Sequence, residues 1–160
     1  MRMPKKGALL FLLLPFCLPL TAFSLPTQIN TPGEKMVLVD PNEEAWGAYN
    51  AQGMLIRSGR ASAGADWCAD MNSTCKTEIG SFRVRSLGNS SCKSPSFPIP
   101  KGGSPMPYCM YFNKYQALHG SYHVGPGNIS HGCIRMHVGD ARWLRNNFVR
   151  PGTLVVIRPY

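Results

Sequence analysis

Short strand-like runs separated by turn residues dominate this sequence and limit it to a mainly β fold. Such runs occupy residues 35–40, 45–49, 54–58, 80–85, 108–112, 115–118 and 153–157. Apolar and β-branched residues bounded by Gly, Pro, Asn and Ser are typical of strands, and the turn at residues 50–53 predicts a hairpin. Residues 86–107 are rich in Ser, Gly and Pro, and we expect a loop there.

One segment near the C-terminus has the character of a helix. We expect it to begin at Asp140, a good N-cap residue, and to run through residues 141–148. Pro151 and Gly152 would end it, because proline cannot continue a helix. The sequence therefore predicts a mainly β domain with one short C-terminal helix.

The first 24 residues resemble a secretory signal peptide. Basic residues are followed by an apolar run from Gly7 to Leu20 and a small-residue site that ends at Ser24. The run is shorter than the roughly 20 residues of a spanning helix, and Pro15 and Pro19 interrupt it. We therefore favour cleavage after Ser24 over a retained membrane anchor, and expect export to the periplasm or cell wall of a bacterium.

The rest of the chain is long enough for one domain with a core. We expect a short N-terminal segment at residues 25–34 and a single domain at residues 35–159. The formal net charge of +9 suits an anionic partner such as a cell wall or membrane surface, although charge for solubility alone is an equally good explanation. Nucleic acid is not expected, because the arginines are scattered and no binding motif is present. We expect a monomer.

Cysteine counting isolates one thiol. An odd number of cysteines follows residue 24, and in an oxidising compartment this leaves one unpaired. Cys68, Cys75, Cys92 and Cys109 could pair in three ways. We favour Cys68 with Cys75 and Cys92 with Cys109, because each pair closes a short loop, but the sequence leaves the other pairings open. Cys133 is then the free thiol.

Cys133 is surrounded by residues that suit a nucleophile. It follows Ser130, His131 and Gly132, and His119 lies fourteen residues upstream. A thiol attacks as its thiolate, which a neighbouring imidazole can generate. We expect His119 to be the base, since it ends a predicted strand and can turn toward the sulfur, and His131 to shape the turn. The backbone N–H groups of Gly132 and Cys133 are natural oxyanion donors.

Two other interpretations concern the neighbouring residues. Arg135 can either clamp a substrate carboxylate through its planar guanidinium or remain a solvated charge. A zinc site would draw its ligands from His119, His123, His131 and Cys133. Their spacing fits no usual zinc pattern, so we expect neither metal nor cofactor. We place His123 and His137 outside the site.

The arrangement of His119-Gly120 followed by residues 130–135 resembles the signature of the L,D-transpeptidase catalytic domain, also called the YkuD domain. Residues 76–82 resemble the family's Thr-Pro-x-Gly-x-Phe segment, and residues 151–157 resemble its closing strand. The resemblance implies a β-sandwich-like YkuD fold over residues 35–159. It also implies sensitivity to carbapenems.

The resemblance implies a cysteine enzyme that acts on peptidoglycan stem peptides. Cys133 would be the nucleophile and form a thioester, and His119 would be the proton donor and acceptor. His131 and Gly132 would belong to the oxyanion region. The implied substrate-binding residues are Gly120, Ser130 and Arg135, and the Gly120 carbonyl would also orient the His119 ring. A second stem peptide would resolve the thioester and form a crosslink; a lipoprotein is a further candidate acceptor.

The sequence departs from the family pattern in three places. Glu78 stands where proline is usual, the segment between His119 and Ser130 is short, and the four central cysteines are not a family hallmark. Two rival functions stay open. One is a Cys-His peptidoglycan carboxypeptidase or endopeptidase that uses water as acceptor. The other is a disulfide-stapled wall-binding protein without activity.

Overall fold

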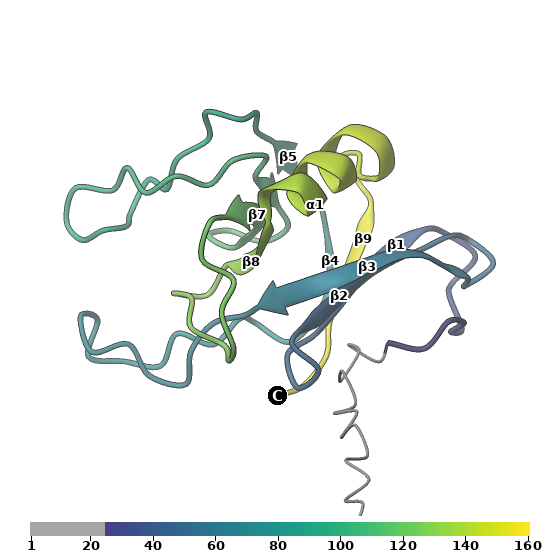
Figure 1. Ribbon diagram of the computed structural model, residues 1–160, viewed down its shortest axis with the longest axis horizontal. Coiled ribbons are helices and arrows are strands. Elements are labelled where there is room, and N and C mark those ends of the chain that lie inside the picture. The colour runs from purple at the N-terminus through teal and green to yellow at the C-terminus, as the bar shows by residue number, and fades with distance from the viewer. Residues whose placement is uncertain (1–24) are drawn as a thin grey trace, which may run out of the picture.

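The computed structural model describes residues 25–160, and these residues form a curled, nine-stranded sheet with one helical segment (Figure 1). The strand order is β4-β9-β1-β2-β3-β8-β7-β6-β5. The strands are β1 (Met36–Asp40), β2 (Ala45–Tyr49), β3 (Leu55–Ser62), β4 (Gly80–Arg83), β5 (Ser86–Leu87), β6 (Met110–Tyr111), β7 (Ala117–Ser121), β8 (Ile134–His137) and β9 (Leu154–Ile157). The prediction of a mainly β fold with one short C-terminal helix is confirmed. The expected signal peptide lies outside the described residues.

Strands β1 and β2, in the first half of the sheet, are buried on both faces. β1 pairs with β9 in parallel and with β2 in antiparallel orientation. Val37 and Val39 face the main core, whereas Met36 and Leu38 face a second apolar cluster. Burial on both faces explains why these strands are continuous apolar runs rather than alternating ones.

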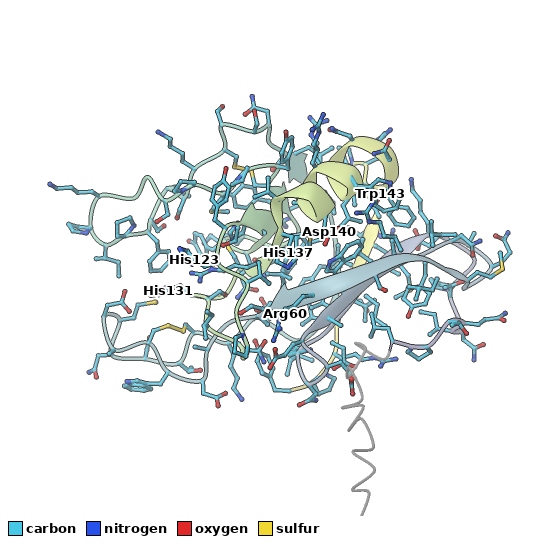
Figure 2. All side chains as sticks on the ribbon, viewed as in Figure 1. Arg60, His123, His131, His137, Asp140 and Trp143 are labelled. Carbon is cyan, nitrogen blue, oxygen red and sulfur yellow. A yellow bond between two sulfur atoms is a disulfide. The ribbon has the colours of Figure 1, made fainter. Side chains whose placement is uncertain are left out.

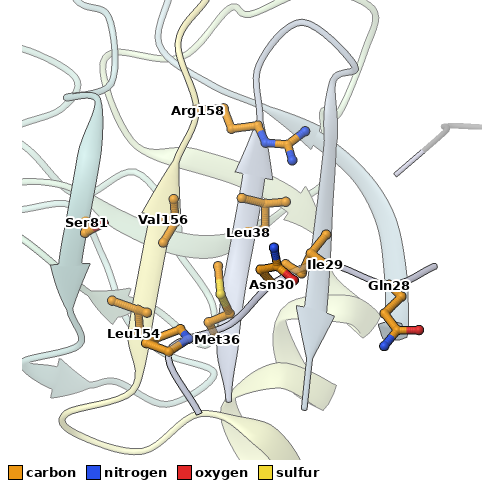
Figure 3. Close-up of a pocket in the computed structure, with 10 residues that line it drawn as sticks. Gln28, Ile29, Asn30, Met36, Leu38, Ser81, Leu154, Val156 and Arg158 are labelled. Carbon is orange, nitrogen blue, oxygen red and sulfur yellow. The ribbon is translucent and has the colours of Figure 1, made fainter. Parts of the chain in front are cut away.

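Residues 25–34 lie against this second cluster. The Leu25 side chain is buried there, and the Ile29 N–H donates to the Gly53 carbonyl at 2.9 Å. A surface cavity of about 760 Å³ lies between this segment and strands β1 and β9 (Figure 3). None of the sequence-predicted site residues lines this cavity.

The second half of the sheet carries the helix. Helix α1 (Val138–Trp143) follows β8 directly and continues as a π-helical turn, η1 (Leu144–Phe148). The prediction of Asp140 as the N-cap is wrong: His137 occupies that position, and Asp140 lies in the first turn. The Asp140 carboxylate instead pairs with Arg57 at 2.8 Å. No helix in residues 25–160 is long and apolar enough to cross a membrane.

Several strands differ from the sequence-based expectation in their bounds, and two were not expected. β3 extends to Ser62 because Ala61 and Ser62 pair with β8. β5 lies inside the predicted loop and pairs with β6. β8 was not predicted at all, although Ile134 and Met136 alternate inward as in a strand. Four residues are too few for alternation to be distinguished from loop sequence.

Candidate active site

Parallel pairing of β7 with β8 brings the key side chains together. The register places His119 opposite Arg135. Cys133 stands two residues before Arg135, in the bend that leads into β8, and the Arg135 charge acts on both the Cys133 thiol and the His119 ring. His119, Cys133 and Arg135 are therefore neighbours although the first lies far from the others in sequence. His123 is exposed beyond the end of β7, and His137 is exposed at the end of β8 (Figure 2).

The His119 ring is buried and has a defined orientation. Its side chain is 5% exposed, and Nδ1 lies 2.8 Å from the Gly120 carbonyl oxygen. A carbonyl only accepts, so Nδ1 must carry the proton, and Nε2 is left with a lone pair. Burial lowers the pKa of His119 to about 4; the Gly120 hydrogen bond opposes this shift, and the nearby Arg135 charge adds to it. The ring is thus neutral at physiological pH and can accept a proton at Nε2.

The Cys133 thiol is free and half-buried, with both other cysteine pairs oxidised. Burial raises the pKa of the thiol, while the Ala117 backbone hydrogen bond and the Arg135 charge lower it. The sulfur lies 3.9 Å from the Tyr115 carbonyl oxygen. Its hydrogen-bond partners within the described residues are therefore Tyr115, just before β7, and Ala117, at the start of β7, and His119 is not among them. Both reacting groups are neutral in this state.

The turn at residues 130–133 is held by its own hydrogen bonds. Gly132 has φ +108°, a conformation that glycine adopts readily. The Ser130 hydroxyl accepts from the Gly132 N–H at 3.0 Å and donates to the Cys133 carbonyl. The Gly132 N–H, which the sequence-based expectation assigned to the oxyanion, is therefore hydrogen-bonded to Ser130 in this structure. Ser130 is also buried, so its hydroxyl supports the turn rather than facing solvent.

Thr77 anchors the same turn and was missed by the sequence analysis as a site residue. Its buried hydroxyl donates to the Gly132 carbonyl at 2.9 Å and accepts from the Gly64 N–H at 3.0 Å. The Thr77 N–H donates to the Tyr160 hydroxyl, which in turn donates to the Gly64 carbonyl. The only sequence signal for Thr77 was its place in the segment of residues 76–82.

The His131 ring is hydrogen-bonded to Asp70 and not to Cys133. His131 Nε2 lies 2.9 Å from Asp70 Oδ2, and the ring stacks on Phe97 with centroids 4.4 Å apart. Cys68, Asp70 and His131 have ligand atoms within 4.8 Å of one another. Cys68 is bonded to Cys75 and cannot offer a thiolate, so this group does not make a metal site.

Both disulfides border the candidate site. The structure joins Cys68 to Cys75 and Cys92 to Cys109, which is the pairing that short loops favoured. The Cys75 sulfur contacts the Ser130 carbonyl oxygen at 3.4 Å. Cys92 and Cys109 share a small apolar cluster with Cys133. These four cysteines thus lie beside the turn at residues 130–133 and not in a remote part of the fold.

Arg135 is partly buried on the same face as Cys133. Burial lowers the pKa of its guanidinium, and the neighbouring Cys133 raises it. Burial of an arginine with a cysteine and a histidine beside it favours the interpretation as a site residue over that of a solvated surface charge.

Comparison with protein families identifies one match. Residues 29–157 match the family model described as "L,D-transpeptidase catalytic domain". No curated protein matches this sequence.

Solved structures share the fold. The L,D-transpeptidase from Xylanimonas cellulosilytica matches with a TM-score of 0.69 and 23% identity, over 81% of this chain and 63% of that one. The Mycobacterium smegmatis L,D-transpeptidase matches with a TM-score of 0.65 and 19% identity, over 79% and 59%. L,D-transpeptidase 3 from Mycobacterium tuberculosis, solved with a faropenem-derived adduct, matches with a TM-score of 0.63 and 21% identity, over 78% and 60%. This chain thus spans about three fifths of the length of the structures it matches.

Proposed function

The chain belongs to the L,D-transpeptidase catalytic domain family, and from this premise we propose that it is a cysteine L,D-transpeptidase that modifies peptidoglycan stem peptides through a thioester on Cys133. The observation that supports the proposal is the pairing of β7 with β8, which sets a buried, neutral His119 opposite Arg135, whose charge also acts on the free Cys133 thiol. The two disulfides fit an exported protein, and we propose the periplasm or cell wall as its location.

The protonation states of the two groups suggest how acylation proceeds. Because thiol and imidazole are both neutral at rest, proton transfer from Sγ to His119 Nε2 accompanies attack on the substrate carbonyl. The sulfur must first leave Tyr115 and Ala117 and turn toward His119. Substrate entering the site would drive this rotation.

The oxyanion that develops on the substrate carbonyl during attack needs hydrogen-bond donors. With the Gly132 N–H engaged by Ser130, the Cys133 N–H is the donor that the turn supplies. His119, now protonated, passes its proton to the leaving amine and a thioester remains on Cys133. Arg135 stands beside these groups and would hold a carboxylate of the stem peptide. An amine of a second stem peptide, or water, then resolves the thioester; a lipoprotein amine is a further candidate.

The test is mass spectrometry of the products formed from a disaccharide-tetrapeptide by purified residues 25–160. We expect crosslinked dimer, with no product from Cys133→Ala. The loss for His119→Ala should be at least about 100-fold, the scale of a lost general base. His123→Ala serves as a control, because His123 is exposed beyond β7. Crosslinking by a folded Cys133→Ala protein would falsify the proposal, and free tripeptide alone would identify water as the acceptor.

A second experiment isolates the covalent step. A carbapenem ring is a strained amide, and its opening by Cys133 would leave a stable adduct. We expect the added mass in intact native protein and its absence in Cys133→Ala. A folded protein that gives neither adduct nor product would favour a wall-binding role without catalysis.

A further inference from the structure

Two disulfide-closed loops project from the same side of the molecule (Figure 1). We call residues 68–75 the first stapled loop and residues 92–109 the second stapled loop, after the disulfides that close them. His131, from the turn that bears Cys133, lies on this side of the molecule (Figure 2).

The His131 side chain contacts both loops. Asp70, in the first stapled loop, accepts from Nε2 through its two oxygens at 3.0 and 2.9 Å. Phe97, in the second stapled loop, packs against the His131 ring, with ring centroids 4.4 Å apart and planes tilted by 33°. Each loop is constrained by its own disulfide, so Asp70 and Phe97, which contact the imidazole, are both carried by constrained segments.

These contacts complete the anchoring of the turn. Thr77 holds Gly132 from one side, and the Ser130 backbone bonds to Ala63 and Ala65. His131 would otherwise be free to rotate, with its side chain 29% exposed. A shift of the backbone at His131 is passed on through Gly132 to the Gly132–Cys133 peptide, which carries the Cys133 N–H that the proposed mechanism aims at the oxyanion. Misplacement of a reacting group by about 1 Å can cost about 100-fold in rate.

We propose that Asp70 is a positioning residue that acts through His131, with Phe97 as the second support, and that the two stapled loops together fix the catalytic turn. This inference rests on the proposed function of Cys133. Asp70 touches neither the sulfur nor His119. The carboxylate oxygens of Asp70 act as acceptors, so their contact requires Nε2 of His131 to carry a proton and thereby selects the tautomer and the ring orientation.

The first test needs no activity. Nitrogen-15 NMR of histidine side chains distinguishes the Nε2–H tautomer from the Nδ1–H tautomer. We expect the neutral His131 ring to be Nε2–H in native protein and to become a mixture in Asp70→Ala. Asp66→Ala is the matched control, since Asp66 is an exposed acid just before the same loop and pairs with Lys76 instead. A His131 spectrum that is identical in all three proteins would overturn the proposal.

The second test measures acylation of Cys133. We expect kcat to fall about 10-fold in Asp70→Ala with KM little changed, by analogy with lost groups that orient a reacting one. Asp66→Ala should match native protein. Asp70→Asn keeps an oxygen acceptor for Nε2–H and should recover most of the rate. When His131 is already alanine, Asp70→Ala should lower the rate no further, because Asp70 then has no imidazole to position.

The outcomes separate the two proposals. If native protein shows the Nε2–H tautomer of His131 but no acylation, the proposed function is contradicted, whereas the contact between Asp70 and His131 is supported. Active protein in which Asp70→Ala retains the native rate, or loses the same factor with and without His131, contradicts the positioning role.

Discussion

At the scale of single residues, the pKa values of His119 and Cys133 are both shifted in the direction that keeps the group neutral before substrate binds. Burial moves the pKa of His119 down to about 4 and moves the pKa of the Cys133 thiol up. A preformed thiolate and imidazolium pair is therefore not the resting state. Arg135 opposes the thiol shift and adds to the histidine shift, so it favours a thiolate beside a neutral base.

These directions make a prediction for pH dependence. Because burial raises the pKa of the Cys133 thiol, its alkylation by iodoacetamide should be slow at pH 7 and should accelerate steadily as the solution is made more alkaline. Arg135→Gln removes a positive charge that stabilises the thiolate, so its alkylation should be slower at any given pH. His119 protonates only near pH 4, so the acid limb of kcat/KM should lie near pH 4. An alkylation rate that levels off by pH 7 would contradict this account.

Gly132 offers a second prediction at this scale. A Cβ at this position would meet Gln116 Nε2 at 2.9 Å, and the φ of +108° is unfavourable for any side chain. We expect Gly132→Ala to lower the free energy of unfolding by about 1–3 kcal/mol and to disturb the catalytic turn. Gly139→Ala is the control, because Gly139 lies in helix α1 with open space around it. Urea unfolding that gives the two variants equal stability would contradict the strain.

At the scale of elements, the parallel pair of β7 and β8 positions His119 and Arg135. The segment of residues 76–82 holds the turn at residues 130–133 in place. Thr77 precedes β4 and reaches the catalytic turn through its hydroxyl. The closing residue Tyr160 reaches Thr77 and Gly64. The segment that follows β9 therefore meets the segment that precedes β4 beside the turn at residues 130–133.

Thr77→Val tests this link. Valine has nearly the same shape as threonine, but it leaves the Gly64 N–H and the Gly132 carbonyl without their partner. A buried group left unsatisfied costs about 1–3 kcal/mol, so we expect a clear loss of stability and a larger loss of acylation. Thr74→Val makes the same chemical change at an exposed threonine and should leave stability and acylation unchanged. Equal melting temperatures for the two variants would count against the role of Thr77.

At the scale of the whole molecule, the disulfides tie long irregular segments to a small core. Residues 64–79 and 88–109 contain little regular structure, and each holds one disulfide. The Cys92–Cys109 pair also packs in the cluster that contains Cys133. Reduction should therefore affect the site as well as stability.

Thiol counting and unfolding check this directly. Native residues 25–160 should show one alkylatable thiol, at Cys133, before reduction. Replacing both Cys92 and Cys109 by serine should lower the stability by about 2–4 kcal/mol. We also expect slower acylation, since the second stapled loop then loses its constraint on Phe97 and His131. Three labelled cysteines in unreduced protein would contradict the pairing.

The sequence by itself predicted the features that depend on local patterns. The apolar runs at residues 35–40, 45–49 and 153–157 became strands because they are β-branched or apolar throughout. The Ser-His-Gly-Cys motif with an upstream His-Gly pointed to the family that the comparison then identified. The odd cysteine was found by counting alone, because an oxidising compartment pairs the others.

Tertiary structure decided what depends on contacts between distant segments. The β7–β8 register put His119 opposite Arg135. Burial, which no local pattern reports, set the protonation states of His119 and Cys133. The partner of His131 proved to be Asp70, sixty-one residues away in sequence, and the Gly132 N–H proved to be occupied by Ser130. Sequence patterns name the residues that can react, whereas only packing in three dimensions determines which atoms they meet and in which charge state.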